Sequence, residues 1–117
     1  MTTTKFNSVT YIGGNGHYVQ VLSCDEFGNL TNDRLPLHLD QYNASPTGFS
    51  WGYEGSGPAQ LAFCILYDFT GNLELAKRYT QRFKRTYIAN LESNQNWTLR
   101  GDVLEGVIQS WEKGLIE

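Results

Sequence analysis

The first half of the chain places short apolar runs between turn residues, a pattern typical of β-strands. Residues 9–12 and 18–22 are rich in β-branched and aromatic side chains, which favour strands. The intervening residues 13–16, Gly-Gly-Asn-Gly, tolerate the positive φ angles of a tight turn, so the two runs predict a β-hairpin. Residues 35–39 alternate apolar and other side chains, and Pro36 cannot donate to a ladder, which together predict an edge strand.

The second half of the chain changes to the spacing of α-helices. Residues 58–69 are apolar around most of a helical circumference, which predicts a buried helix. Gly57 is acceptable at its N-cap and Pro58 is suited to its first position. A second helix is expected from about residue 73 to residue 91, with Asn72 as its N-cap.

The clearest helical pattern lies near the C-terminus. Asp102 and Glu105 match a variant of the capping box that begins helices. The apolar residues of this segment recur at helical spacing, namely Leu104, Val107, Ile108, Trp111 and Leu115. Residues 97–99, Trp-Thr-Leu, precede this helix and are expected to form a short strand or a turn.

These elements together predict an α+β fold. A small antiparallel sheet, made of the N-terminal hairpin plus the edge strand, is expected to pack against three C-terminal helices. Residues 1–117 are expected to form one domain, with residues 1–7 as a flexible N-terminus. The apolar faces of the first and third helices must cover each other or the sheet, and the residues expected in that core are Leu61, Ile65, Phe69, Leu104, Ile108 and Trp111.

Composition and charge narrow the classes of function. The chain of 117 residues has a formal net charge of −3, which disfavours non-specific binding to nucleic acid. No apolar run approaches the roughly 20 residues that a membrane span requires. The first five residues lack the apolar core of a signal peptide, so a cytoplasmic protein with no membrane association is expected. Cys24 and Cys64 are too few for a disulfide scaffold or a four-cysteine zinc site.

The sequence contains few residues in patterns typical of a catalytic site. Neither His17 nor His38 has a second histidine at metal-ligand spacing, so no metal site and no cofactor is expected. Ser56 lies between glycines, but not in the Gly-x-Ser-x-Gly elbow of hydrolases. A triad of Ser56 with either histidine and a carboxylate such as Asp40 stays open, because such partners meet in space rather than in sequence.

The most unusual segment is the glycine-rich and aromatic run of residues 48–62, GFSWGYEGSGPAQLA. Its glycines lead into the start of the expected helix, where unpaired N–H groups and the helix dipole favour an anion. It is neither a P-loop nor a dinucleotide fingerprint. Either the aromatics pack beneath the helix while the glycines turn the chain, or the segment is a ligand or partner site. The residues of such a site would be Trp51, Tyr53, Glu54, Gly55, Ser56, Gly57 and Gln60.

A basic stripe is expected on the second helix. Arg78, Arg82 and Arg85 follow one another at spacings of four and three residues, which places them on one face. The stripe could meet an anionic partner. The alternative is the solvated face of an amphipathic helix.

The run S-P-x-G-F-x-W-G-Y-x-G-S-G-P-A-Q-L-A, over residues 45–62, resembles the signature of a known family. This is a family of small uncharacterised proteins, a domain of unknown function, from phages, plasmids, bacteria and archaea. Looser matches are Leu-Pro-Leu at residues 35–37, residues 79–84 and Trp-Thr-Leu at residues 97–99, so the resemblance covers about residues 11–111. It brings no activity with it, and its occurrence on mobile elements implies only a role in phage–host conflict or phage biology.

Three classes of function follow. The first is a small non-enzymatic interaction protein of phage or mobile-element type that modulates a host or defence protein, with an unknown protein as its partner. It would need an exposed aromatic or charged patch. The alternative is a binder of a phosphorylated small molecule or nucleotide at the glycine-rich turn before the Pro58 helix, which would need a pocket there. The second alternative is a small hydrolase-like enzyme.

Overall fold

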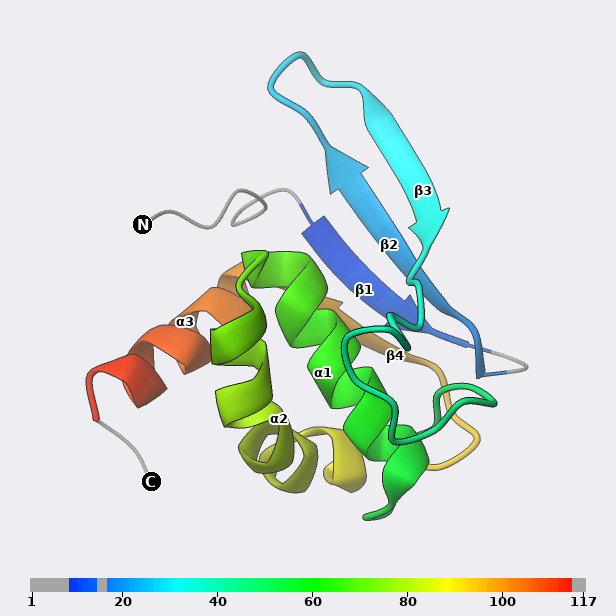
Figure 1. Ribbon diagram of the computed structural model, residues 1–117. Coiled ribbons are helices and arrows are strands. Elements are labelled where there is room, and N and C mark those ends of the chain that lie inside the picture. Colours follow the sequence, from blue (N-terminus) through cyan, green and yellow to red (C-terminus); the bar gives the residue numbers. More distant parts are fainter. Residues whose placement is uncertain (1–8, 15–16, 115–117) are drawn as a thin grey trace.

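Residues 9–14 and 17–114 are described by a computed structural model of the protein (Figure 1). The expected flexible N-terminus at residues 1–7, the centre of the first glycine turn and Leu115 lie outside the described residues. A sheet forms one layer and the helices cover one of its faces, so the predicted α+β fold is confirmed.

The sheet has four antiparallel strands in the order β3-β2-β1-β4. The strands are β1 (Val9–Gly13), β2 (Val19–Cys24), β3 (Leu30–Arg34) and β4 (Trp97–Arg100). Strands β1 and β2 form the predicted hairpin, in which Tyr11 lies opposite Val21. Strand β4 pairs with β1, which decides between the strand and the turn expected for residues 97–99.

The edge strand lies earlier in the chain than the pattern predicts, and the prediction of a strand at residues 35–39 is wrong. The carboxylate of Asp25 accepts hydrogen bonds from the N–H groups of Phe27 and Asn29, both at 2.9 Å, and so turns the chain directly back. The returning strand β3 has the sequence LTNDR, and all of its residues are exposed. An edge strand that projects from the body has no apolar alternation, so the sequence carried no signal for it.

The helices are α1 (Ser56–Thr70), α2 (Leu73–Thr86) and α3 (Gly101–Glu112), with a 3₁₀ helix, η2 (Ile88–Asn90), after α2. Helix α1 begins two residues before the expected Pro58, with Gly55 at its N-cap. The second expected helix ends at Thr86 instead of continuing to residue 91. Asn72 caps α2 as predicted, because its side chain accepts a hydrogen bond from the N–H of Leu75 at 3.0 Å.

The predicted capping box at the start of α3 is wrong. Arg100 is the N-cap residue and the helix has no side-chain cap. Asp102 instead receives two hydrogen bonds from the guanidinium of Arg100, at 3.0 and 2.5 Å. Glu105 is buried and accepts a hydrogen bond from the side chain of Gln109 at 2.8 Å. The two carboxylates therefore bond to side chains, Asp102 to one two residues earlier and Glu105 to one four residues later, and do not cap the helix.

The core lies between the sheet and the helices, and α1 is buried along most of its length. All the residues expected in the core belong to one buried cluster, which confirms that prediction. Helix α3 meets α2 through Trp111, whose ring centroid lies 5.3 Å from that of Tyr79 and 6.2 Å from that of Phe83.

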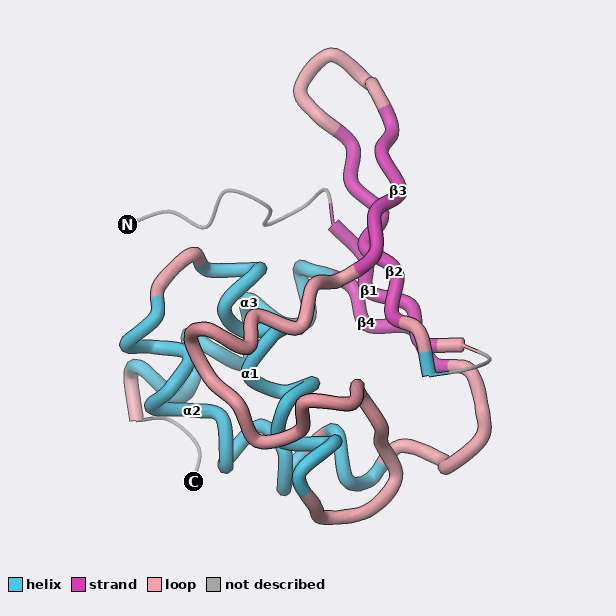
Figure 2. The backbone as a smooth tube through the Cα atoms, turned by 45° about the vertical axis from the view of Figure 1, so that its right-hand side comes forward, coloured by secondary structure: helices cyan, strands magenta, loops and turns pink. Residues whose placement is uncertain are grey.

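The β2–β3 hairpin projects beyond the helices as an arm, as two views of the chain show (Figures 1 and 2). Near its tip, Phe27 is 81% exposed and Leu30 is 80% exposed. An isolated two-stranded hairpin is marginally stable in water, so the arm depends on β2, whose residues 19–23 pair with β1.

Candidate functional site

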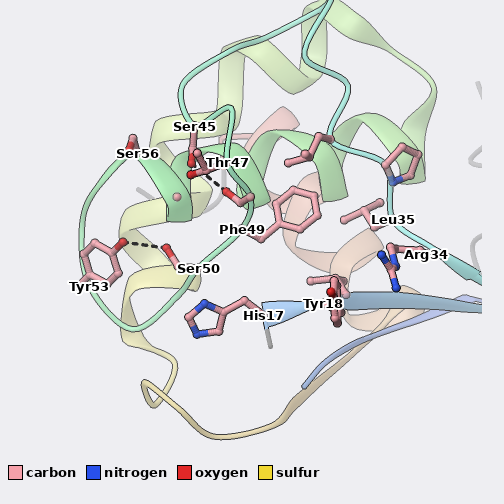
Figure 3. A pocket seen from close by; sticks show the side chains of 15 residues that line it. His17, Tyr18, Arg34, Leu35, Ser45, Thr47, Phe49, Ser50, Tyr53 and Ser56 are labelled. Atoms are coloured by element: carbon pink, nitrogen blue, oxygen red, sulfur yellow. Dashed lines mark hydrogen bonds between the residues drawn. The ribbon is translucent and has the colours of Figure 1, made fainter. Parts of the chain in front are cut away.

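A groove of about 730 Å³ lies where the hairpin arm meets the start of α1 (Figure 3). One wall is formed by the beginning of β2 and the end of β3, and the other by residues 45–53 and the first turn of α1. The volume lies within the range of small-molecule sites. Phe49 is buried in the floor, while Tyr53 and Ser56 stand at the rim.

Gln60 holds the loop that forms one wall of the groove. Its side-chain oxygen accepts hydrogen bonds from the N–H groups of Ala44 and Ser45, at 2.8 and 3.0 Å. Its side-chain nitrogen donates to the carbonyls of Leu37 and Tyr42, both at 2.8 Å. These bonds use the full capacity of the amide, and the side chain is completely buried. Gln60 therefore supports the groove from behind and is closed to a ligand.

Cys64 lies one turn further along α1 and supports the same loop. Its thiol donates a hydrogen bond to the carbonyl of Leu37 at 3.0 Å. Burial is the main reason that the pKa of this thiol rises to about 12. Cys64 is therefore a protonated structural donor at neutral pH and not a nucleophile.

Two glycines of the motif are required by local geometry. Gly52 has φ +90°, a backbone conformation that L side chains rarely adopt, and its N–H donates to the carbonyl of Ile88 at 3.1 Å. A Cβ atom at Gly57 would collide with the side chain of Ser50. These glycines let residues 50–57 pass close to η2 and to the start of α1.

Trp51 packs in the interior and does not line the groove. It is only 3% exposed, and its indole N–H donates to the carbonyl of Gln95 at 3.2 Å. Its ring meets Trp97 edge-on at 5.5 Å and the imidazole of His17 at 4.8 Å between centroids. For Trp51 the packing interpretation of the motif therefore holds, although the indole supports His17, which does line the groove.

The remaining motif residues are divided between the groove and other roles. Tyr53, Ser56 and Gly57 line the groove, and the hydroxyl groups of Tyr53 and Ser50 are hydrogen-bonded at 2.8 Å. Glu54 does not line it and forms an ion pair with Lys84, with 3.7 Å between carboxylate and ammonium. Gly55 is the N-cap of α1. The structure thus brings together only part of the candidate site.

The charge of the groove comes from residues that the sequence analysis did not select for binding. Among the described lining residues, Arg34 and His17 carry basic groups and none carries a carboxylate. The guanidinium of Arg34 lies over the ring of Tyr18, 4.0 Å from its centroid. Within the described parts of the chain, Arg34 forms no ion pair. A groove with a basic, acid-free lining in a chain of net charge −3 favours an anion.

The spacing of residues along the sequence could not have predicted that Arg34 and His17 line the same groove. Arg34 ends an exposed strand and His17 precedes another, and both lie far along the chain from residues 50–57. The available hint was that Arg34 precedes the Leu-Pro-Leu segment at residues 35–37, which resembles part of the family pattern. Only the pairing of β2 with β3 brings them to one wall.

The basic stripe of α2 lies outside the groove and is partly engaged. Arg78 pairs with Glu112 at 3.4 Å, and the guanidinium of Arg82 lies 4.8 Å from the ring centroid of Trp111. Arg85 is exposed. Two of the three arginines thus contact α3, and binding of an anionic partner by the stripe stays a prediction.

The groove holds parts of the proposed triad but does not assemble it. His17 and Ser56 both line it, whereas His38 and Asp40 do not. Because no described lining residue has a carboxylate, the third member of a Ser–His–carboxylate triad is missing there. No group of three or more His, Cys, Asp or Glu side chains in the described chain is placed to hold a metal ion.

These features define a small α+β protein with a ligand-sized, basic groove at the start of its central helix. The chain belongs to a family of unknown function, DUF6166, whose profile matches residues 19–111. The matched region extends from the first residue of β2 to Trp111 in α3 and contains the whole second wall of the groove. No curated protein and no solved structure matches the chain. No helix in the described residues has the length and hydrophobicity needed to cross a membrane.

Proposed function

We propose that the chain is a small non-enzymatic binding protein that holds an acidic segment of a partner protein in the groove. The observation that carries the proposal is the position of Arg34, an exposed cation without an ion pair among the described residues, at the mouth of a groove with no described carboxylate. An unpaired guanidinium held against an aromatic ring is well suited to a carboxylate, because it offers a planar fork of donors.

The biological setting of the proposal comes from the family resemblance. It includes an origin on phages or other mobile elements and a host or defence protein as the partner. A cytoplasmic location is a separate part of the proposal and does not come from the resemblance. A binding protein of this kind needs only a shaped surface and no catalytic group, and the groove together with the exposed arm provides such a surface.

A second candidate is binding of a phosphorylated small molecule in the same groove. Ser56 stands in the first turn of α1, and Ser50 and Thr47, which also carry hydroxyls, lie on the same wall. Hydroxyls and helix N-termini suit phosphate oxygens. The volume of about 730 Å³ would admit a nucleotide-sized molecule.

The test is a titration of the ¹⁵N-labelled protein at low salt with N-acetylaspartate, inorganic phosphate and adenosine monophosphate. The amide resonances of His17, Arg34 and Ser56 should shift with at least one of these probes. The Arg34→Ala variant should bind that probe roughly tenfold more weakly, since it loses a charge-assisted hydrogen bond. The matched control is Arg85→Ala, an exposed arginine outside the groove, which should bind like the parent.

The proposal fails if none of the probes shifts resonances in the groove at low salt. It also fails if Arg34→Ala binds as the parent does. A response to phosphate and adenosine monophosphate without one to N-acetylaspartate would select the second candidate.

A further inference from the structure

The pairing of β3 with β2 defines which backbone N–H and C=O groups of β3 point outward from the sheet. The N–H of Leu35 donates to the carbonyl of Val19 at 2.8 Å, and β2 and β3 continue in register from that pair. In an antiparallel ladder, alternate residues bond to the same neighbour. Thr31, Asp33 and Leu35 therefore face β2, whereas the N–H and C=O groups of Leu30, Asn32 and Arg34 point away from the sheet.

This outer edge is open in the described structure. Strand β3 is the last strand on its side of the sheet, and all of its residues are exposed. The arm stands away from the helices, so no described helix covers it (Figure 2). An open strand edge is a template for an added strand.

The edge has different chemistry at its two ends. Arg34 stands at one end, beside the groove, and Pro36, which has no N–H, ends the ladder just beyond it. Leu30 stands at the other end, three residues after Phe27 of the turn, and both side chains are largely exposed. Leu30, Asn32 and Arg34 share one face of the strand because side chains alternate.

We infer that an extended segment of a partner protein adds to β3 as a further strand. The segment places an acidic side chain opposite Arg34, at the groove, and an apolar side chain opposite Leu30. The two partner side chains are four residues apart, since Leu30 and Arg34 are. This inference rests on the proposed function for the role of Arg34 and adds the backbone ladder and the spacing.

A second copy of the chain fits this edge less well than an acidic partner. If two copies paired through β3 with their outward groups matched about Asn32, Arg34 would lie opposite Leu30 of the second copy. Neither arginine would then meet a carboxylate. The charge pattern therefore selects a partner of different sequence, in which an acid follows or precedes an apolar residue by four positions.

The first experiment is selection of binders from a displayed library of random 12-residue peptides with the full chain as the target. The expected binders are rich in β-branched residues and carry Asp or Glu four positions from a large apolar residue. A selection without enrichment, or with binders that lack this spacing, would overturn the inference.

The second experiment tests the ladder on one selected peptide. Asn32→Pro removes only an outward N–H and no hydrogen bond to β2, so the sheet should persist. Peptide affinity should fall at least tenfold, while Asn32→Ala, which keeps the N–H, should bind within twofold of the parent. Circular dichroism, and a titration with whichever groove probe binds the parent, verify that fold and groove are intact.

The peptide itself provides a control if Asn32→Pro does not fold. Backbone N-methylation at residues that face β3 should abolish binding, whereas methylation at the alternate residues should leave it unchanged. Equal effects at both sets would overturn strand addition. Sedimentation of the protein alone should show a monomer, and a dimer that is lost in Asn32→Pro would instead assign the edge to a second copy.

The two proposals fail in different ways. If phosphate or N-acetylaspartate binding depends on Arg34 but peptide binding is insensitive to Asn32→Pro, the strand addition is wrong and the groove stands. If peptide binding depends on Asn32 but not on Arg34, the anionic groove is wrong, and with it the acidic position of the partner.

Discussion

The side-chain amide of Gln60 donates a hydrogen bond to the backbone carbonyl of Leu37 at 2.8 Å. This contact joins the central helix to the loop that follows the hairpin arm. From the sequence, Gln60 is a candidate binding residue. In the structure its side chain instead holds the loop that forms one wall of the groove. A variant at Ser56 tests a residue that lines the groove, whereas a variant at Gln60 tests the stability of the loop behind it. The two residues are therefore substituted in separate variants.

Replacing Gln60 with Leu should destabilise the fold by at least about 3 kcal/mol, because it leaves buried backbone donors and acceptors of residues 37–45 without partners. The measurement is the free energy of unfolding in urea. Gln81→Leu, on the exposed side of α2, is the matched control and should change stability by about 0.5 kcal/mol or less. A loss below about 1 kcal/mol at Gln60 would show that the loop is held by other contacts.

Shortening core side chains in α1 and α3 should reveal one shared core. Ile65→Ala and Ile108→Ala should each cost about 2–5 kcal/mol in chemical denaturation, because both residues are buried in the same cluster. Val103→Ala, at a largely exposed position of α3, serves as the control and should cost far less. Losses below about half a kcal/mol at both isoleucines would contradict the assignment of the helix faces.

The buried thiol of Cys64 should make stability fall as the pH rises above about 9. The pKa of this thiol is raised from 9.0 to about 12 in the folded protein, chiefly by burial. Between these values the unfolded chain loses the proton while the folded chain keeps it, so rising pH favours unfolding, by at most about 1.4 kcal/mol per pH unit. Urea unfolding at pH 8 and pH 10 measures the effect, and Cys64→Ala should reduce the pH dependence.

Thiol labelling at pH 8 provides an independent check on Cys64. Cys24 is half-buried and near the arm tip, whereas Cys64 is fully buried. A thiol reagent should therefore label Cys24 in the native protein and Cys64 only in denaturant. Rapid native labelling of Cys64, detected by mass spectrometry, would contradict its placement beneath the loop.

Charge reversal on α2 should leave the groove unaffected. Arg78→Glu combined with Arg85→Glu should keep the affinity for the groove probes within about twofold at moderate salt, since these arginines do not line the groove and exposed charges are screened. Stability should fall by about 1 kcal/mol at most, because the pair of Arg78 with Glu112 is exposed. Loss of probe binding in this variant, with Arg34 intact, would move the anion site to α2.

Features set by neighbouring residues could be predicted from the sequence, whereas features set by distant contacts could not. The apolar circumference of residues 58–69 was sufficient to predict a buried central helix, because burial on all sides leaves that pattern in any sequence. The glycines of residues 13–16 and the spacing of α3 likewise report local backbone and burial. The edge strand was missed because the exposed residues of LTNDR carry no such constraint.

The sequence by itself thus determined the α+β class and the helix faces, and it selected residues 48–62 as the candidate site. Only the tertiary structure decided which residues of that segment face a groove and that Arg34 and His17 join them there. It also decided that Gln60 and Trp51 serve the interior. The physical reason is that periodicity records whether a side chain is buried, whereas convergence of distant residues depends on strand register and loop path, which no local pattern encodes.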